Sequence, residues 1–244
     1  SALLDAGLMH AGAKTCFGNG FGDFCQEPTL IDGQIEWRSA AATSLDPEIL
    51  TTPATPFAPN GGVKLLEGNL GRSVIKTSAV QEQHHIVEAP AVVIDDQDDL
   101  KPLFEAGELD KDCVVVVRFQ GPAANGMPEL HKLTPMLGVL QDRGHKVALV
   151  TDGRMSGASG KVPAAIHLVP EASQGGPLAK IQTGDVIRLD ATTGELSAQI
   201  DETEFKSRTE AQAPNVPRTL GRGLFSNNRL ATSSAEEGAS SLFI

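Results

Sequence analysis

The sequence predicts an α/β fold in which a barrel-like mixed β-sheet domain with flanking helices follows an extended arm or linker. Three observations lead to this prediction. Short apolar and β-branched segments recur along most of the chain, few segments have helical periodicity, and a proline- and glycine-rich stretch precedes them. The 244 residues suit one large domain or one domain with a tail, and 40% hydrophobic residues suffice for a packed core.

The first 60 residues differ in composition from the rest of the chain. Proline removes a backbone donor and favours extended or turn geometry, and four prolines fall in one short stretch: Pro47, Pro53, Pro56 and Pro59. We therefore expect residues 1–60 to form an arm or linker and residues 61–212 to form the barrel-like domain. Residues 213–244 are rich in Gly, Ser and Asn, which predicts an extended or poorly ordered tail.

Strands are predicted where short segments are apolar and often β-branched. The run from Cys113 to Val117 is apolar throughout, which is typical of a central strand buried on both faces. The predicted strands are 63–66, 73–76, 85–88, 91–94, 113–117, 146–150, 164–168, 185–189 and 195–198, with a turn at 191–194 between the last two.

Helices are predicted at three places. Asp95 and Asp96 open the first, which extends to Gly107. Thr134 and Pro135 have the chemistry of an N-cap and a first helical residue for a second helix, which reaches Asp142 and stops at Gly144. Residues 201–211 form the third.

Composition excludes several classes of function. Twenty basic and 31 acidic residues give a net charge of −11, which argues against a nucleic-acid or anionic membrane surface because phosphates select clustered Lys and Arg. No apolar run approaches the ~20 residues that cross a bilayer. Cys16, Cys25 and Cys113 are few and odd in number, so we expect a reducing, cytoplasmic location and structural cysteines. The start at Ser1 suggests an excised fragment.

Two polar loops follow predicted strands. Residues 118–130 come after the strand that ends at Val117, and residues 151–161 come after the strand that ends at Val150. Ligands favour the carboxyl ends of strands in α/β sheets, and glycine lets a backbone approach a ligand closely. The alternative is that both segments are ordinary tight loops.

The chain resembles the dihydroxy-acid dehydratase / 6-phosphogluconate dehydratase family in three motifs. The first is Val150–Gly160 (VTDGRMSGASG) with Pro170-Glu171-Ala172, the second is Gly121-Pro122 with 126–129 (GMPE), and the third is 61–63 (GGV) with 68–70 (GNL). The resemblance extends from about residue 1 to about residue 210. Segments 128–135 and 157–163 are similar to the phosphogluconate branch of the family.

The resemblance implies a carboxy-terminal domain of the swivelling type, in a hydro-lyase of the Entner–Doudoroff pathway. Such an enzyme converts 6-phospho-D-gluconate to 2-dehydro-3-deoxy-6-phospho-D-gluconate and water. It also implies an iron–sulfur cluster, expected to be 4Fe–4S rather than 2Fe–2S, and a Mg²⁺ ion. The cluster ligands are expected in an amino-terminal domain outside this chain, with residues 1–60 as that domain's last part, and the full-length enzyme is expected to be a homodimer.

Site residues follow from the match to the family motifs. Ser156 matches the catalytic serine, which removes the proton next to the carboxylate, and a nearby cation would have to stabilise its alkoxide. Ser159 is the second candidate for this base and otherwise a substrate hydrogen-bond partner. Glu129 matches the glutamate that helps to hold Mg²⁺, since hard cations prefer carboxylate oxygens. Each has a structural alternative: a loop-capping hydroxyl for Ser156 and an exposed acid at a helix start for Glu129.

Four basic residues could bind the anionic groups of the substrate. Arg154, His131, Lys132 and Lys161 form a local basic set in an otherwise acidic chain, and phosphate and carboxylate both need cationic donors. We expect Lys161 and the His131-Lys132 pair to help to select the phosphorylated substrate, with solvated surface charge as the alternative. Asp152 could pair with Arg154 or fix its loop by an Asx-turn, and we expect the structural role.

Two other functions compete with the dehydratase interpretation. A serine hydrolase would use Ser156 with His167, but the nucleophile elbow requires G-x-S-x-G and Gly153-Arg-Met-Ser has one residue too many. The isolated chain could instead be a non-catalytic interaction or sugar-acid-binding domain. Within the family, the substrate could also be another sugar acid or a dihydroxy acid.

Overall fold

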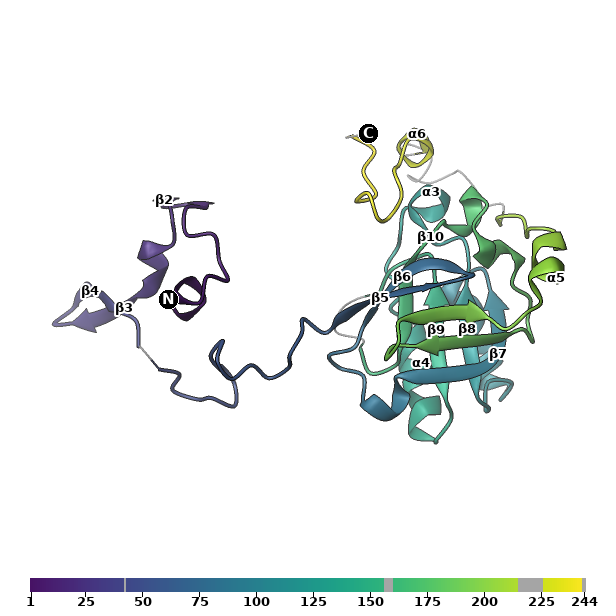
Figure 1. Ribbon diagram of the computed structural model, residues 1–244, viewed down its shortest axis with the longest axis horizontal. Helices are drawn as coiled ribbons and strands as arrows, with labels where there is room; N and C mark the ends of the chain where they lie inside the picture. The colour runs from purple at the N-terminus through teal and green to yellow at the C-terminus, as the bar shows by residue number, and fades with distance from the viewer. Residues whose placement is uncertain (42, 156–159, 215–225, 243–244) are drawn as a thin grey trace. The chain divides into compact units, whose positions relative to one another are not determined.

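The computed structural model describes residues 1–41, 43–155, 160–214 and 226–242 (Figure 1). The chain divides into two compact units, Ser1–Gly61 and Gly62–Ile244. The division falls at the Asn60-Gly61-Gly62 sequence that ends the proline-rich stretch, and Gly62 adopts a φ of 68° there. The residue after the boundary, Val63, begins the first strand of the second unit.

The first unit contains two small antiparallel hairpins in what was expected to be an extended arm. Its elements are α1 (Ala2–Asp5), β1 (Lys14–Thr15), β2 (Gly18–Asn19), a 3₁₀ turn at Gly22–Cys25, β3 (Gln26–Ile31) and β4 (Gln34–Ser39). Asp32 and Gly33 join β3 to β4 with φ values of 48° and 77°, the left-handed pair that a two-residue hairpin turn requires.

One face of the β3–β4 hairpin is apolar and exposed. Pairing of Pro28 with Trp37 and of Leu30 with Ile35 places these four side chains on the same face, and all four are exposed. None of the described residues of Ser1–Gly61 is buried. Two-stranded hairpins gain stability by packing on other elements, so this unit does not form a core of its own from its described residues.

The second unit is a closed eight-stranded barrel, which confirms the predicted barrel-like mixed sheet (Figure 1). The strands are β5 (Val63–Gly68), β6 (Gly71–Lys76), β7 (Ile86–Ile94), β8 (Cys113–Val117), β9 (Val147–Thr151), β10 (Ala164–Val169), β11 (Val186–Asp190) and β12 (Glu195–Ala198). Their order is β10-β6-β5-β12-β11-β7-β8-β9. Neighbours from β7 to β10 pair in parallel, as do β12 and β5, and the other pairs are antiparallel.

Strand β7 joins two segments that were predicted as separate strands. Pro90 lies between them and lacks an N–H donor, which is unfavourable in the middle of a sheet. In the structure Pro90 faces only Val186, the first residue of β11, and pairing of β7 with β8 begins one residue later at Ala91. Pro90 therefore lies at the end of the pairing with β11 and before the pairing with β8, so its missing N–H group does not interrupt either ladder.

Two apolar clusters hold the barrel together. Alternate residues of β8 divide between them: Val114 and Val116 point into the barrel with Val150 of β9, whereas Val115 and Val117 join a cluster with Leu137 outside it. Both faces of β8 are thus buried, which explains its uninterrupted apolar sequence. The outer cluster lies beneath α2 (Leu100–Glu105) and α4 (Leu133–Asp142).

The helices begin and end at other residues than predicted. Helix α4 starts at Leu133 after Lys132, so the prediction of Thr134 as N-cap was wrong, and Pro135 fits because the first turn has no intrahelical partners for its N–H groups. Before α2 a 3₁₀ turn (Gln97–Asp99) takes up part of the predicted helix, and Asp96 caps it. Helix α5 (Glu202–Ser207) is capped by Asp201 and ends four residues before the predicted Ala211.

The described part of the C-terminal tail, residues 226–242, is folded rather than extended. It contains α6 (Ser226–Leu230), which lies beside the short helix α3 (Pro122–Asn125) in Figure 1. Glu236 forms an ion pair with Arg72 of β6 at 2.7 Å, and Ser233 N donates to Ser240 O at 3.0 Å. Side-chain contacts to the barrel thus anchor a segment whose polar composition predicted disorder.

Leu137→Ala should lower the free energy of unfolding by about 2–5 kcal/mol, because Leu137 is fully buried between α4 and β9. Val139→Ala on the same helix is the matched control, since Val139 is 42% exposed and alanine favours helix. Urea unfolding of the two variants measures the difference. Equal stabilities would contradict the assignment of the outer cluster.

Candidate functional site

The carboxyl ends of three neighbouring strands bring the candidate loops together. Strands β8, β9 and β10 are parallel, so the segments that follow them leave the barrel at the same edge. After β8 come residues 118–130, after β9 come residues 152–155, and after β10 come residues 170–172. These segments contain the motifs that carry the family resemblance.

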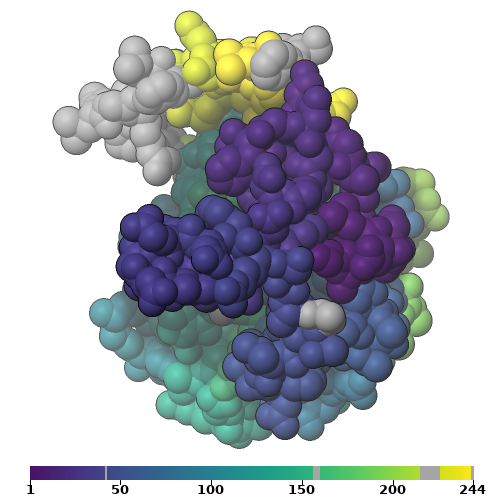
Figure 2. Space-filling view, turned by 90° about the vertical axis from the view of Figure 1, so that its left-hand side faces the viewer, coloured from purple at the N-terminus to yellow at the C-terminus, as the bar shows by residue number. Residues whose placement is uncertain are grey.

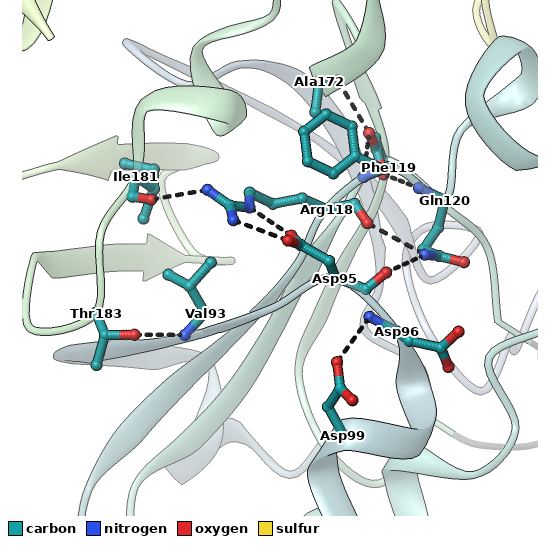
Figure 3. Close-up of polar contacts among 11 residues, drawn as sticks. Val93, Asp95, Asp96, Asp99, Arg118, Phe119, Gln120, Ala172, Ile181 and Thr183 are labelled. Carbon is teal, nitrogen blue, oxygen red and sulfur yellow. Dashed lines mark hydrogen bonds and ion pairs between the residues drawn. The ribbon is translucent and has the colours of Figure 1, made fainter. Parts of the chain in front are cut away.

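A buried carboxylate ties these three segments together. Asp152 is fully buried and accepts hydrogen bonds from the backbone N–H groups of Phe119 (3.2 Å), Gln120 (2.8 Å) and Ala172 (2.9 Å). Figure 3 labels these three donor residues. Burial raises the pKa of the Asp152 carboxyl to about 6, although the three amide bonds favour its charged form. Asp152 therefore has the structural role that the sequence predicted, as the common acceptor of two loops besides its own.

An ion pair supports the same edge from the adjacent strand. Arg118 donates to both oxygens of Asp95, at 2.7 Å and 3.1 Å, and the side-chain amide of Gln120 donates to the Asp95 carbonyl at 2.7 Å (Figure 3). Asp96 caps the following 3₁₀ turn. The acidic run at 95–99 thus has structural roles at its first two positions, in line with its interpretation as a helix start.

A second carboxylate fixes the loop after β8. Glu171 accepts from the backbone N–H groups of Ala123 (3.2 Å) and Ala124 (3.1 Å), which start α3. A Cβ atom on Gly121 would lie 1.8 Å from a Glu171 oxygen, so only glycine fits there. Two of the motifs quoted for the family resemblance, Gly121-Pro122 and Pro170-Glu171-Ala172, are therefore in direct contact.

The two candidate loops meet at Glu129 and Arg154. These residues form an isolated parallel β-bridge, and Leu130 N donates to Arg154 O at 3.1 Å. The Arg154 side chain returns to the first loop, where its Nε donates to Met127 O at 2.8 Å. The carboxylate expected to bind Mg²⁺ and a guanidinium expected to bind substrate are thus on adjacent backbones.

The proposed base lies next to this bridge in the sequence but outside the described residues. Ser156 follows Arg154 by two positions, and Ser159 lies three residues further on. The described structure ends at Met155 and resumes at Gly160. The roles assigned to the two serines remain predictions.

The other predicted substrate-binding residues divide between the two ends of α4. His131 has a ring nitrogen 3.4 Å from Glu129 O, and Lys132 forms an ion pair with Asp98 at 2.5 Å, both just before the helix. Lys161 pairs with Asp142, the last residue of α4. Ten helical residues span about 15 Å, so the structure does not bring Lys161 to the Glu129–Arg154 bridge.

His167 is a residue of this edge that sequence analysis considered only as a hydrolase partner. It has a φ of 57° within β10, where pairing with β6 changes register, and its N–H donates to Gly153 O at 2.9 Å. Burial and then the charge of Arg154 lower the pKa of the half-buried imidazole. A positive φ at a non-glycine residue is a signal of local constraint, but the strand pattern of the sequence does not reveal it.

The described residues do not by themselves form a metal or cluster site. Among them, no three His, Cys, Asp or Glu side chains gather closely enough to hold an ion. Cys113 is buried in β8, and burial raises the pKa of its thiol to about 11, which opposes the thiolate form that a cluster needs. Glu129 supplies one oxygen donor of the kind that Mg²⁺ prefers, and further ligands would have to come from elsewhere.

Comparison with known proteins defines the family. Residues 48–239 match the sequence model "Dihydroxy-acid/6-phosphogluconate dehydratase C-terminal". The chain therefore belongs to the dihydroxy-acid/6-phosphogluconate dehydratase family. Among the described residues, no helix is long and apolar enough to cross a membrane.

Curated relatives locate the chain within this family. It is 56% identical over 240 residues to a phosphogluconate dehydratase of Pseudomonas aeruginosa, and 54% identical to one of Escherichia coli K12. A dihydroxy-acid dehydratase of Ignicoccus hospitalis is 34% identical. These matches cover 97–98% of this chain but 40% of each relative, so the chain spans about two fifths of the length of the relatives that it matches.

Asp152→Asn should lower the stability at neutral pH, because an amide oxygen can replace only one of the two oxygens that accept the three N–H bonds. It should also change the pH dependence. The pKa is raised to about 6 in the folded chain, so stability contributed by the protonated carboxyl is complete below about pH 4 and lost as the pH rises through 6.

Thermal melting of both proteins between about pH 4 and pH 8 measures this contribution. The loss on raising the pH should be smaller in Asp152→Asn than in the wild type. Asp142→Asn is the control, since Asp142 is exposed and pairs with Lys161. Parallel pH profiles for the wild type and Asp152→Asn would contradict a buried, titrating Asp152.

Proposed function

We propose that this chain is the carboxy-terminal part of an enzyme that dehydrates 6-phospho-D-gluconate to 2-dehydro-3-deoxy-6-phospho-D-gluconate. The observation that carries the proposal is the bridge between Glu129 and Arg154 at the carboxyl ends of β8 and β9. It joins the two motif loops directly before Ser156. The higher identity to the phosphogluconate dehydratases than to the dihydroxy-acid dehydratase supports this substrate over a dihydroxy acid.

The proposed reaction needs a base at C2 and a cation for the carboxylate. Ser156 takes the proton from C2, the hydroxyl leaves C3, and the resulting enol gains a proton at C3 to give the 2-keto acid, with a net loss of water. A serine is a weak base, so its alkoxide requires stabilisation by nearby positive charge. Arg154 lies two residues away and has a planar guanidinium that suits a carboxylate.

Metal and cluster belong to the complete enzyme in this proposal. When bound, the iron–sulfur cluster supplies a Lewis acid for the departing hydroxyl, and Mg²⁺ supplies charge at the carboxylate. Glu129 contributes one ligand to Mg²⁺. The remaining ligands, including every cluster thiolate, come from an amino-terminal domain, and the described residues form neither site alone.

The same domain is the proposed partner of the first unit. The exposed apolar face of Pro28, Leu30, Ile35 and Trp37, together with the lack of buried residues among those described in Ser1–Gly61, supports packing against another domain. A homodimer of the full-length enzyme and a cytoplasmic location complete the proposal. The small number of cysteines supports the latter.

A second candidate function applies to the isolated chain. Because no three potential ligands gather among its described residues, it could bind sugar acids without turning them over. Incubation of this chain with 6-phosphogluconate, iron, sulfide and Mg²⁺ should give no 2-keto acid product. Formation of that product at a sustained rate would overturn the proposal that another domain supplies the cofactor ligands.

In the full-length enzyme, Ser156→Ala should abolish turnover because it removes the base, while the visible absorbance of the cluster should remain. Product formation and the absorbance spectrum are measured on the same samples. Lys101→Ala is the control, since Lys101 is exposed on α2 and pairs with Glu105. Turnover at the wild-type rate in Ser156→Ala would remove Ser156 from the mechanism.

The effects of the basic residues on kcat/KM and on substrate preference can be compared in the same assay. Arg154→Ala should lower kcat/KM by about a hundredfold, as expected for loss of a charged contact near the reacting carbon. Lys161→Ala tests the prediction that Lys161 selects the phosphate, which requires it to leave Asp142. An unchanged preference for 6-phosphogluconate over gluconate in Lys161→Ala would count against that role.

A further inference from the structure

The C-terminal segment 226–242 and the loop that follows β8 line an open cavity. The cavity measures about 240 Å³ and is lined by Pro122, Gly126 and Met127 of the loop and by Asn228, Arg229, Thr232 and Ala239 of the segment. Figure 2 shows this segment, in yellow, gathered at one end of the barrel unit. A cavity of this size can hold a phosphate group or several water molecules.

The lining has the chemistry of an anion site. Arg229 is half-buried and is the charged side chain among the described lining residues; Asn228 adds a side-chain amide, whereas the Thr232 hydroxyl already donates to Asn228 O. Three other cavities lined by described residues contain carboxylates: Glu171 and Glu237 in one, Glu202 beside Lys180 and Lys206 in the second, and Asp95, Asp96 and Asp99 in the third. In a chain of net charge −11, a cavity with an arginine and no acidic residue among its described lining residues favours an anion.

The segment that carries Arg229 is held in place from both sides. Thr232 Oγ1 donates to Asn228 O at 2.7 Å, which closes the end of α6, and the ion pair of Glu236 with Arg72 anchors the following turn to β6. The absent Cβ of Gly126, whose φ is 70°, would lie 3.8 Å from the Arg229 side chain. Arg229 therefore packs on the glycine that ends α3.

Met127 connects this cavity to the candidate active site. Met127 lines the cavity, and its carbonyl oxygen accepts a hydrogen bond from Arg154 Nε at 2.8 Å. Glu129 lies two residues further along, so its Cα is within about 7 Å of that of Met127. Arg154 thus contacts the Met127 carbonyl, and Arg229 packs beside the preceding residue, Gly126.

We propose that Arg229 and the cavity around it bind the phosphate of a sugar-acid phosphate and set the preference for phosphorylated substrate. The inference rests on the proposed function, which supplies a substrate with an anionic group at each end. Arg154 then serves the carboxylate end, and Arg229 serves the phosphate end several bonds away. The C-terminal segment is thereby a part of the substrate site rather than a passive tail.

The test uses the full-length holoenzyme with 6-phosphogluconate and with gluconate. Arg229→Ala should raise KM for 6-phosphogluconate by about tenfold or more and leave kcat little changed, because the phosphate contact is equal in ground and transition states. The kinetics with gluconate should not change. Arg229→Lys should restore most of the affinity, and Arg143→Ala, which alters an exposed arginine paired with Asp110, should have no effect.

A second variant tests the same inference in case Arg229→Ala disturbs the folding of the segment. Asn228→Asp keeps the size of an exposed side chain but adds a negative charge to the cavity lining, so it should weaken binding of 6-phosphogluconate and not of gluconate. Inorganic phosphate should compete with 6-phosphogluconate in the wild type and compete less well in both variants. Melting temperatures within a few degrees of the wild type establish that the variants are folded.

The possible failures are distinguishable. If the wild-type enzyme dehydrates gluconate as well as 6-phosphogluconate, the proposed substrate is wrong. If the wild type prefers 6-phosphogluconate and folded Arg229→Ala and Asn228→Asp keep that preference, the inference about Arg229 is overturned while the proposed function stands.

Discussion

The candidate site depends on one buried carboxylate. Asp152 sits at the end of β9 and accepts backbone N–H groups from the segments after β8 and β10, so three loops share a single acceptor. Hydrogen bonds to a charged group contribute about 1.5–3 kcal/mol each, more than bonds between neutral groups. Because Asp152 is buried, a loop that moved away would leave an acceptor inside the protein without that N–H partner, which costs free energy. Arg154, which forms the bridge with Glu129, lies two residues after Asp152 in the sequence.

The surroundings of Asp152 explain why small residues recur in the loops. A Cβ atom on Gly153 would lie 2.7 Å from the Gln120 side chain, and one on Gly121 would collide with Glu171. Carboxylates thus hold the loop backbones through hydrogen bonds, and glycines let the loops pack closely against them. Arg154 adds positive charge to the same loops. In an acidic chain, this division separates the residues that hold the loops from the residues that can meet an anionic substrate.

Sequence patterns predicted the parts of the fold in which burial dictates residue type. Strands such as 113–117 were recognisable because both faces are covered, and both candidate loops were expected directly after predicted strands. The bridge between Glu129 and Arg154 was seen only in the structure. Patterns failed where long-range contacts decide. Pro90 lies within β7 because it is at the end of the pairing with β11 and before the pairing with β8. Residues 226–242 contact the barrel through the ion pair of Glu236 with Arg72 and through the α3 loop. The constraint at His167 arises from a register change between β10 and β6, which local sequence does not encode.

The strand order has a consequence for how this unit can associate. The first strand, β5, pairs with the last, β12, so the eight described strands form a ring in which each has two partners. A ring of this kind offers no row of unsatisfied backbone groups to an incoming chain. A neighbouring domain is therefore expected to contact this unit through side chains and loops. Such contacts can form and separate without the loss of any strand pairing.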